Sequence, residues 1–383
     1  FDIEVDTEDP ESFIQTVVNI AKTFGGINLE DIKAPECFEI ERRIAEETDI
    51  PVMHDDQHGT AIISGAALIN AVELQGKQLD EVKVVVIGAG ASAIACANHY
   101  VALGVTRGNI KMIDSKGILT KKRLLNNELN EYKADFAHDI PEGDLSAALE
   151  GADVLLGLSK GGLVSKEMIA SMAEKPIIFA LANPTPEITP EEVAEVRDDA
   201  IMATGRSDYP NQVNNVLGFP YIFRGALDVR ATDITQNMKM AATKALAELA
   251  KEPVPDYISE AYDGATMQFG PEYIIPKPFD RRVLIWEASA VAQAAVDEGI
   301  TQVSKDEFLI SQYREELESR LGLSYSIMRH MINQVRGRGK RIVFPEGDNE
   351  KVIRAAAQLV DQRICHPILL GSKERIDSMV EEL

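Results

Sequence analysis

The sequence predicts an α/β protein built around a doubly wound parallel sheet. Three observations indicate this class. Short apolar runs rich in β-branched residues recur from residue 82 onwards, beginning with VKVVVIGAG. Helical or turn segments separate these runs, and a glycine-rich turn follows the first of them. Continuous apolar runs are typical of strands buried on both faces, and alternation with helices is typical of parallel sheets.

Composition narrows the class of protein further. The 383 residues are enough for two or three domains. The net charge of −23 makes binding to nucleic acid or to an anionic membrane unfavourable. No apolar run reaches the roughly 18 residues of a membrane span. The three cysteines, Cys37, Cys96 and Cys365, lie among apolar residues, which predicts reduced core thiols in a cytoplasmic protein.

Residues 1–75 are predicted to form part of a separate α/β domain that binds metal. Apolar residues such as Phe13, Val17 and Ile20 recur there at helical spacing. A short strand, IPVMHDD, is expected to end in an acid pair. The predicted helices cover residues 11–24, 36–47 and 59–74.

Residues 76–300 contain the predicted sheet, which is Rossmann-like. Two Ala-rich helices, over 236–250 and 283–297, are expected to close this domain. The strands predicted after VKVVVIGAG are NIKMID, ADVLLGL, KPIIFALANP and DAIMATG.

The remaining residues predict a linker and a further domain. Residues 301–335 are polar and are predicted to form a linking pair of helices. Residues 336–383 read as strand, helix, strand and helix, from RIVFPEGD to KERIDSMVEEL. Four elements are too few for a usual α/β domain of about 100 residues or more. We therefore expect only the start of a second α/β domain here.

The turn GAGASA follows a predicted strand and opens a predicted helix, which is the context of a dinucleotide-binding fingerprint. Its glycines allow a tight turn and close approach to a diphosphate, which would bind at the positive end of the helix. A plain glycine turn is the alternative. The candidate cofactor-binding residues are Gly88, Ala89, Gly90, Ala91 and Ser92.

The residues that follow the next strand bear on the choice of cofactor. Asp114 can accept a hydrogen bond from a ribose 2′-hydroxyl, which favours NAD. Ser115 and Lys116 can instead accommodate the 2′-phosphate of NADP. These residue types alone leave both cofactors open.

Polar residues also follow later strands, at the edge where doubly wound sheets bind ligands. Ser159 follows the third strand and Asn183 the fourth, and Asn214 and Asn215 come after the fifth. Asparagine before proline is often only a turn residue, and asparagine pairs are common in loops.

Four acidic residues, Glu30, Asp31, Asp55 and Asp56, form a candidate metal site. Carboxylate oxygens suit Mg²⁺ or Mn²⁺ better than zinc. Adjacent residues point apart, so we expect one of the aspartates at 55 and 56 to bind the metal and the other to support it. A solvated loop is the alternative. The two flanking histidines are expected to cap or pack rather than to carry protons.

Taken in order, the motifs INLEDI, HDDQHGTA, VVIGAGASA, DSKG, FALANPTPEI and VNNVLGFPYIFRGALD resemble malic enzyme over residues 10–300. RIVFPEGDNEKVIRAAAQLVD resembles the start of a phosphotransacetylase, as in the bacterial malic enzyme–phosphotransacetylase hybrids. The resemblance implies NADP-dependent oxidative decarboxylation of (S)-malate to pyruvate and CO₂, assisted by a divalent metal. It also implies a homo-oligomer and regulation by acetyl-CoA through the C-terminal region.

The resemblance also implies roles for individual residues. Glu30, Asp31 and Asp56 match metal ligands, with Asp55 as the supporting acid, and DSKG at 114–117 matches members that prefer NADP. Residues 89–92 match the dinucleotide loop, Asn183 an asparagine near nicotinamide and substrate, and Asn214 one that holds the substrate carboxylate.

The family's catalytic lysine base and tyrosine acid lie upstream of these motifs. We therefore expect the protein to continue beyond both ends of this sequence, and residues 1–383 alone not to turn over malate. Two other functions stay open: a different NAD(P) dehydrogenase on the same fold, and an acyl- or phosphoryl-transfer protein with a dinucleotide domain as sensor. A chelator should leave the first of these active, and the second should not reduce nicotinamide with malate.

Overall fold

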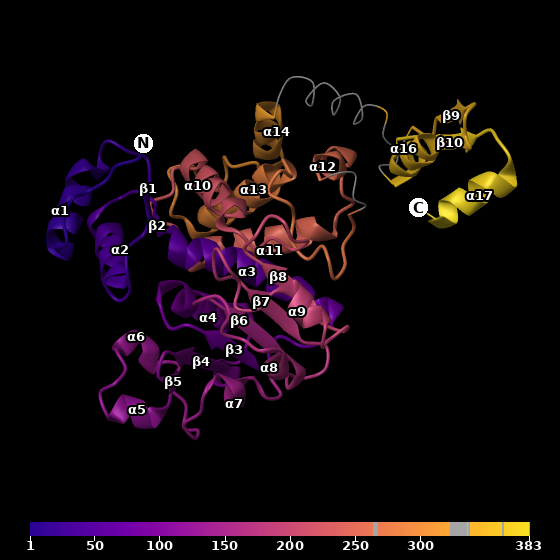
Figure 1. Ribbon diagram of the computed structural model, residues 1–383. Helices are drawn as coiled ribbons and strands as arrows, with labels where there is room; N and C mark the ends of the chain where they lie inside the picture. The colour runs from indigo at the N-terminus through magenta and orange to yellow at the C-terminus, as the bar shows by residue number, and fades with distance from the viewer. Residues whose placement is uncertain (263–266, 322–334, 336–337, 362–363, 383) are drawn as a thin grey trace. The chain divides into compact units, whose positions relative to one another are not determined.

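The structure is a computed structural model that describes residues 1–262, 267–321, 335, 338–361 and 364–382. These residues divide into two compact units, Phe1–Ile310 and Ser311–Leu383 (Figure 1). The finer division predicted at residues 75 and 335 stays a prediction.

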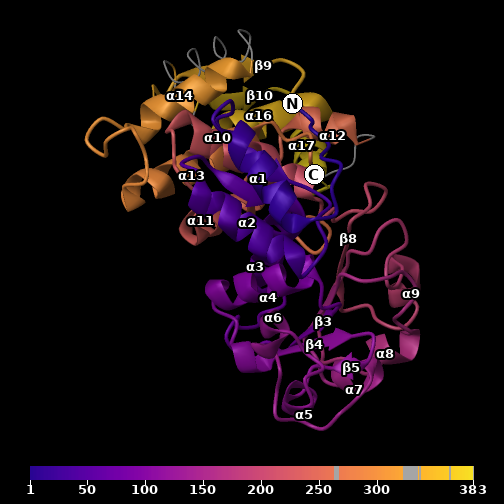
Figure 2. The same ribbon diagram turned by 90° about the vertical axis from the view of Figure 1, so that its left-hand side faces the viewer.

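The first unit begins with two helices and two strands that enclose a small apolar core. Asp9 starts the first helix, because its carboxylate accepts a hydrogen bond from the backbone N–H of Ser12 (3.0 Å). The two helices lie side by side (Figure 2), and the two strands pair in parallel. The elements are α1 (Pro10–Ala21), β1 (Ile27–Leu29), α2 (Glu36–Glu47) and β2 (Val52–His54).

The next helix, α3 (Asp55–Leu74), differs from the prediction at its start. It begins at Asp55 rather than at residue 59, so both aspartates of the acid pair lie in its first turn. Acidic side chains are favourable there because the N-terminal end of a helix carries partial positive charge. Most residues of this helix are buried, and most of those are small or apolar, as the sequence predicts.

The central sheet has six strands in the order β5-β4-β3-β6-β7-β8. The five predicted strands are confirmed and all run parallel. The sixth, β5, is a two-residue antiparallel edge strand that the sequence did not predict. The strands are β3 (Val84–Ile87), β4 (Ile110–Asp114), β5 (Gly117–Ile118), β6 (Val154–Gly157), β7 (Ile177–Ala180) and β8 (Ile201–Thr204).

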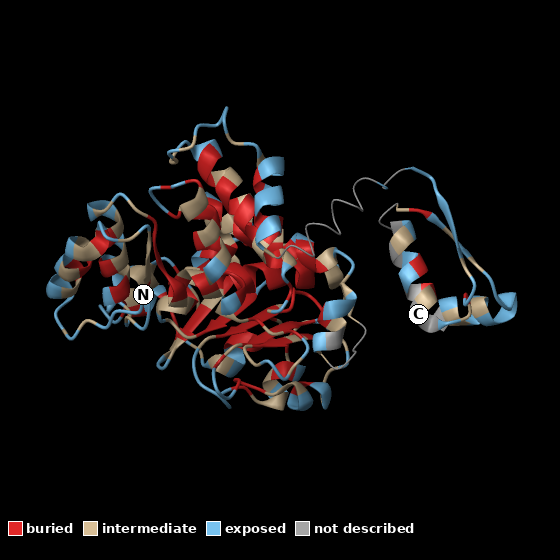
Figure 3. Cartoon of the chain, turned by 90° about the horizontal axis from the view of Figure 1, so that it is seen from above, coloured by how far each residue is buried: buried red, intermediate tan, exposed pale blue. Residues whose placement is uncertain are grey.

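Helices cover both faces of this sheet, as a doubly wound fold requires. In Figure 1, α3, α4 and α11 lie on one face and α7 and α8 on the other, and buried residues concentrate in the strands and the helices packed on them (Figure 3). The elements between the strands are α4 (Ala91–Leu103), η1 (Arg107–Asn109), α5 (Lys121–Leu125), α6 (Glu131–Ala134), α7 (Leu145–Leu149), α8 (Lys166–Ala170) and α9 (Pro190–Ala194).

Helices after β8 complete the first unit. The two Ala-rich helices predicted at 236–250 and 283–297 are confirmed as α11 and α13, which pack against each other. The elements are η2 (Asn215–Leu217), α10 (Phe219–Asp228), α11 (Gln236–Lys251), α12 (Asp256–Ala261) and α13 (Arg282–Glu298).

The second unit has the predicted strand–helix–strand–helix series, with its two strands parallel. A polar helix, α14 (Ile310–Arg320), precedes it, whereas the second helix predicted within 301–335 falls largely outside the described residues. The series is β9 (Arg341–Phe344), α16 (Glu350–Asp361), β10 (His366–Leu369) and α17 (Lys373–Glu382). None of the helices in the described ranges combines the length and apolar character that a membrane crossing requires.

Candidate functional site

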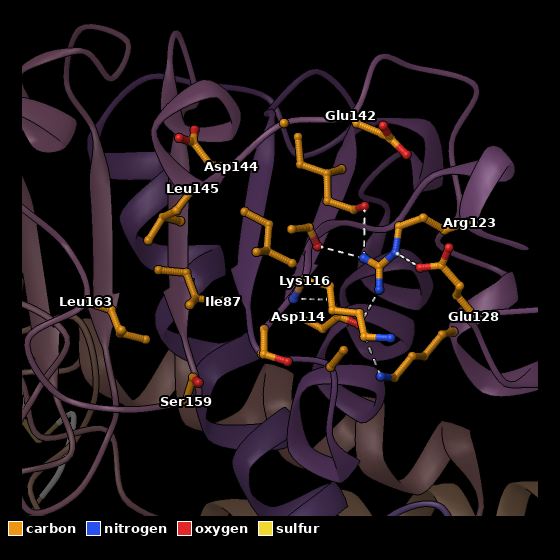
Figure 4. A pocket seen from close by; sticks show the side chains of 18 of the residues that line it. Ile87, Asp114, Lys116, Arg123, Glu128, Glu142, Asp144, Leu145, Ser159 and Leu163 are labelled. Atoms are coloured by element: carbon orange, nitrogen blue, oxygen red, sulfur yellow. Dashed lines mark hydrogen bonds and ion pairs between the residues drawn. The ribbon is translucent and has the colours of Figure 1, made fainter. Parts of the chain in front are cut away.

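Two cavities open at the carboxyl ends of the central strands. The strand order reverses at β3, whose neighbours are β4 and β6, and doubly wound sheets bind ligands at such a switch point. The first cavity has a volume of about 1030 Å³ and is shown in Figure 4. The second cavity has a volume of about 630 Å³. Ser159, just beyond β6, lines both.

The predicted glycine turn lies between the two cavities. Gly88 and Ala89 line the first cavity and Ser92 the second, whereas Gly90 and Ala91 line neither. Gly88 has a φ of 116°, and a Cβ there would lie 2.7 Å from the carbonyl oxygen of Leu158. Only glycine allows the turn to pack this closely against the end of β6. No side chain caps α4, which leaves its first backbone N–H groups available to an anion.

Asp114, Ser115 and Lys116 line the first cavity, where cationic groups surround the carboxylate of Asp114. The Arg123 guanidinium donates to it at 2.8 Å (Figure 4). The Lys133 ammonium lies 3.5 Å from the same oxygen. The backbone N–H of Lys116 donates to its other oxygen. Burial acts to raise the pKa of Asp114, but these three groups together lower it below its usual value.

The acidic residues reach the second cavity through the pairing of β1 with β2. Leu29 lies opposite His54 in this parallel pair, so Glu30 and Asp55, the next residues in each segment, come close together. Glu30, Asp55 and Asp56 line the second cavity. Asn183, beyond β7, and Asn214, beyond β8, line it as well, as does Asn215. Residues from four separate segments therefore meet at this cavity.

Asp55 is a buried acid with only part of its hydrogen-bonding capacity used. Its Oδ2 accepts from the Asn215 side-chain amide at 3.1 Å, whereas its Oδ1 is buried without a hydrogen-bond partner. Burial raises its pKa to about 6, although the hydrogen bond from Asn215 lowers it, and the charges of Glu30 and Asp56 raise it further. The surroundings of Asp55 thus disfavour its ionised form unless a cation lies nearby.

The other predicted ligands differ from one another. Glu30 accepts from Asn28 (2.6 Å), and burial, together with nearby acids, raises its pKa. Asp56 accepts from the backbone N–H of Asp31 (2.8 Å), whereas the Asp31 side chain lines neither cavity. Within the described ranges, no three His, Cys, Asp or Glu side chains are arranged to hold a metal ion. The predicted ligand set of Glu30, Asp31 and Asp56 therefore stays a prediction.

The flanking histidines line neither cavity. His58 pairs with Glu41 at 3.0 Å. His54 is fully buried and its ring nitrogens make no hydrogen bond, with Nε2 at 3.7 Å from Asp56 Oδ2. Its backbone N–H donates to Glu41 (2.9 Å).

Several contacts at the cavities could not be derived from sequence patterns. Arg123 and Lys133 reach Asp114 from polar segments without periodicity. Asn215 donates to Asp55. The sequence showed only a pair of adjacent asparagines, and the substrate-binding role was predicted for Asn214. Glu187, which accepts hydrogen bonds from the backbone beyond β6 and β7, had no sequence signal except its position after ANPTP.

The sheet, the glycine turn at its switch point and the paired cavities define a Rossmann-like dinucleotide-binding protein. Residues 57–258 match the malic enzyme NAD-binding domain, and residues 3–45 match the malic enzyme N-terminal domain. Residues 326–383 match the phosphate acetyl/butaryl transferase family. The chain belongs to the malic enzyme family.

Relatives with curated names agree with this assignment. An NADP-dependent malic enzyme of Halomonas elongata is 57% identical over 79% of this chain and 71% of its own length. Two Rhizobium meliloti proteins, named NADP-dependent and NAD-dependent malic enzyme, are 51% and 48% identical over 97% and 99% of this chain. This chain spans about half the length of those two, at 48% and 49%.

A solved structure shows the same fold. The crystal structure of Entamoeba histolytica malic enzyme is 38% identical to this chain, with a TM-score of 0.74, over 87% of this chain and 67% of the other. The hybrid type expected from the sequence is confirmed, because the malic enzyme matches are followed by the transferase match.

Proposed function

We propose that this chain carries the substrate and cofactor sites of an enzyme that converts (S)-malate to pyruvate and CO₂ with NADP. One observation carries the proposal. Carboxylates and amides from four segments line the second cavity, which shares Ser159 with the larger first cavity at the switch point of the sheet. A dinucleotide along the first cavity would therefore bring its reactive ring beside a small polar acid in the second.

The first cavity supports NADP rather than NAD. Lys116, Arg123 and Lys133 are three cationic side chains at the position where the 2′ group of the adenosine ribose is expected. The carboxylate of Asp114, which an NAD enzyme would offer to the 2′-hydroxyl, is already engaged by Arg123 and by the backbone N–H of Lys116. A phosphate dianion would gain charge-assisted hydrogen bonds there. A nicotinamide cofactor held by these residues would supply the hydride acceptor for oxidation of malate at C2.

The second cavity supports a divalent cation, Mg²⁺ or Mn²⁺. Its donor chemistry fits such an ion, because the acids offer hard oxygens and Asp55 Oδ1 is buried without a partner. The raised pKa values of Asp55 and Glu30 are the second support, since a nearby cation would relieve the repulsion between these groups. We propose Glu30, Asp31 and Asp56 as ligands and Asp55 as the acid beside them. When bound, such an ion acts as a Lewis acid on substrate oxygens.

The asparagines would bind and orient the substrate. Asn183 and Asn214 present amides to the second cavity, and amide N–H groups can donate to the carboxylates of a C4 dicarboxylic acid. Asn215 holds Asp55 through one amide atom and accepts from Thr60 Oγ1 (3.0 Å) through the other. Leu158, Leu181 and Phe219 supply an apolar wall that limits water at the reacting carbons.

The expected homo-oligomer, the cytoplasmic location and the effect of acetyl-CoA belong to the same proposal. The match of residues 326–383 to a phosphate acetyl/butaryl transferase supports an acyl-CoA-related ligand for the C-terminal region.

The test is an assay of the full-length protein with malate and either NADP or NAD, with and without Mn²⁺. We expect NADP reduction that depends on Mn²⁺ and pyruvate formed in equal amount. Equal rates with NAD would contradict the cofactor choice, and undiminished activity with chelator would indicate a different dehydrogenase. No nicotinamide reduction at all would refute the proposed function.

A further inference from the structure

Glu187 is a fully buried acid on the loop between β7 and α9. Its carboxylate accepts two backbone hydrogen bonds, from Ser159 N–H to Oε1 (3.0 Å) and from Ala182 N–H to Oε2 (3.1 Å). Ser159 lies just beyond β6, and Ala182 lies just beyond β7. One side chain therefore joins the ends of two neighbouring strands.

The fold makes room for this carboxylate. Gly157 is the last residue of β6, and a Cβ on it would lie 2.4 Å from the carboxyl carbon of Glu187. Two backbone bonds fasten the same pair of loops: Gly162 N–H donates to Pro186 O, and Val164 N–H donates to Glu187 O, both at 3.0 Å. The glycine, the carboxylate and the paired loops form one packed unit.

Burying a carboxylate costs free energy, and burial raises the pKa of Glu187 although both backbone N–H groups lower it. The two N–H groups lie beyond the strand ladders, where backbone donors need a partner from outside the sheet. The residues they belong to border the cavities: Ser159 lines both, and Ala182 lines the second and precedes Asn183. Both carboxylate oxygens of Glu187 thus accept hydrogen bonds from backbone segments that line the cavities.

We propose that Glu187 is a positioning residue, which fixes the distance between the ends of β6 and β7 and so holds Ser159 and Asn183 at the junction of the two cavities. The inference rests on the proposed function, in which the reactive end of the dinucleotide lies at this junction. Glu187 acts through the backbone and does not touch the substrate.

The first test is E187Q in the full-length protein. Glutamine keeps the shape but offers only one acceptor oxygen, so its amide group faces one of the two N–H donors and one strand end loses its partner. We expect kcat/KM for NADP to fall about 10- to 100-fold, as when a group that orients a ligand is removed. The Mn²⁺ activation constant should stay within about twofold, because the acids that follow β1 and those that begin α3 are untouched.

Glu192 provides the matched control. It caps α9 five residues further along the chain, where its exposed carboxylate accepts from Thr189. E192Q should lower the melting temperature slightly and leave all kinetic constants unchanged. A binding titration with NADPH, followed by its fluorescence, separates binding from turnover in each variant.

A double-mutant cycle with Gly157 tests the packing argument. G157A should impair NADP use in the wild type, because its methyl group displaces the carboxylate, and should do much less in an E187A background, where the space is empty.

The proposal is overturned if folded E187Q binds NADPH and turns over malate like the wild type, or if Mn²⁺ activation weakens as much as NADP use. It is also overturned if G157A is equally harmful in both backgrounds. A wild-type protein that neither binds NADPH nor oxidises malate would instead refute the proposed function itself.

Discussion

Asp114 in the first cavity is partly buried and Asp55 in the second is buried, and the charges around these two carboxylates are of opposite sign. Arg123 and Lys133 contact Asp114 and lower its pKa below the usual value. Burial raises the pKa of Asp55 to about 6, and the charges of its neighbours Glu30 and Asp56 act in the same direction. At the first cavity, cationic side chains of the chain itself neutralise the acid. At the second cavity, among the residues that the structure describes, the acids have no such partner beside Asp55, and their negative charge favours a cation.

Removing the proposed divalent cation should give the largest effect. We expect D56N, or a chelator, to lower malate oxidation by the full-length enzyme about 1000-fold, because Lewis-acid stabilisation amounts to several kcal/mol and about 1.4 kcal/mol corresponds to tenfold in rate. Titration with Mn²⁺ measures the loss. D49N, at an exposed aspartate on the preceding turn, is the control and should behave as wild type. Full activity of D56N would contradict the contrast between the cavities.

A smaller effect is expected at the first cavity. K133A removes a cation that lies 3.5 Å from Asp114. We expect KM for NADP to rise about tenfold, since a hydrogen bond to a charged group contributes about 1.5 kcal/mol or more. KM for NAD should change little. The measurement is therefore the ratio of KM for NADP to KM for NAD. K121A, at an exposed lysine, serves as control. An equal rise in KM for both cofactors would show that Lys133 does not distinguish the 2′-phosphate of NADP from the 2′-hydroxyl of NAD.

The raised pKa of Asp55 predicts a dependence of stability on pH. Its folded-state pKa of about 6 exceeds the ordinary 3.8, so the folded state binds more protons between these values and the free energy of unfolding falls as pH rises through that window. Denaturant melts of metal-free protein should show this slope. D55N should lose that part of the slope, because it cannot titrate, and saturating Mn²⁺ should also suppress it. A wild-type slope identical to that of D55N would argue against the raised pKa.

The smallest effect is expected at a carboxylate that borders neither cavity. Asp9 caps α1 through its bond from Ser12 N–H. D9A should lower the melting temperature by a few degrees at most and leave the constants for NADP and Mn²⁺ unchanged. If it altered either constant, the effects at the cavities could not be assigned to local charge.

The sequence allowed the sheet to be predicted because its five parallel strands are buried on both faces and therefore read as continuous apolar runs. The helix at Glu36–Glu47 was predicted with its observed ends because its apolar face has clear helical spacing. The start of α3 was placed wrongly because DDQHG has poor helix formers and no apolar periodicity. The edge strand Gly117–Ile118 was too short to give a pattern.

The site was predictable only in part. Residues next to a strand end could be found from position alone, as with Ser159 and Asn183. Partners that meet through tertiary packing, such as Arg123 with Asp114 or Asn215 with Asp55, are separated along the chain and gave no local signal.

The parallel pairing of Ile27–Leu29 with Val52–His54 has a consequence for insertions and deletions. The spacing between Glu30 and the acids of α3 depends on a three-residue backbone ladder, whose residues Leu29 and Val52 also pack in the apolar core of this region. A shift of one residue would move Glu30 by about 3.3 Å and turn it to the opposite side of the strand. Conservative side-chain changes in these two segments should therefore be tolerated, whereas gain or loss of a single residue between Ile27 and Glu30 should separate the acids.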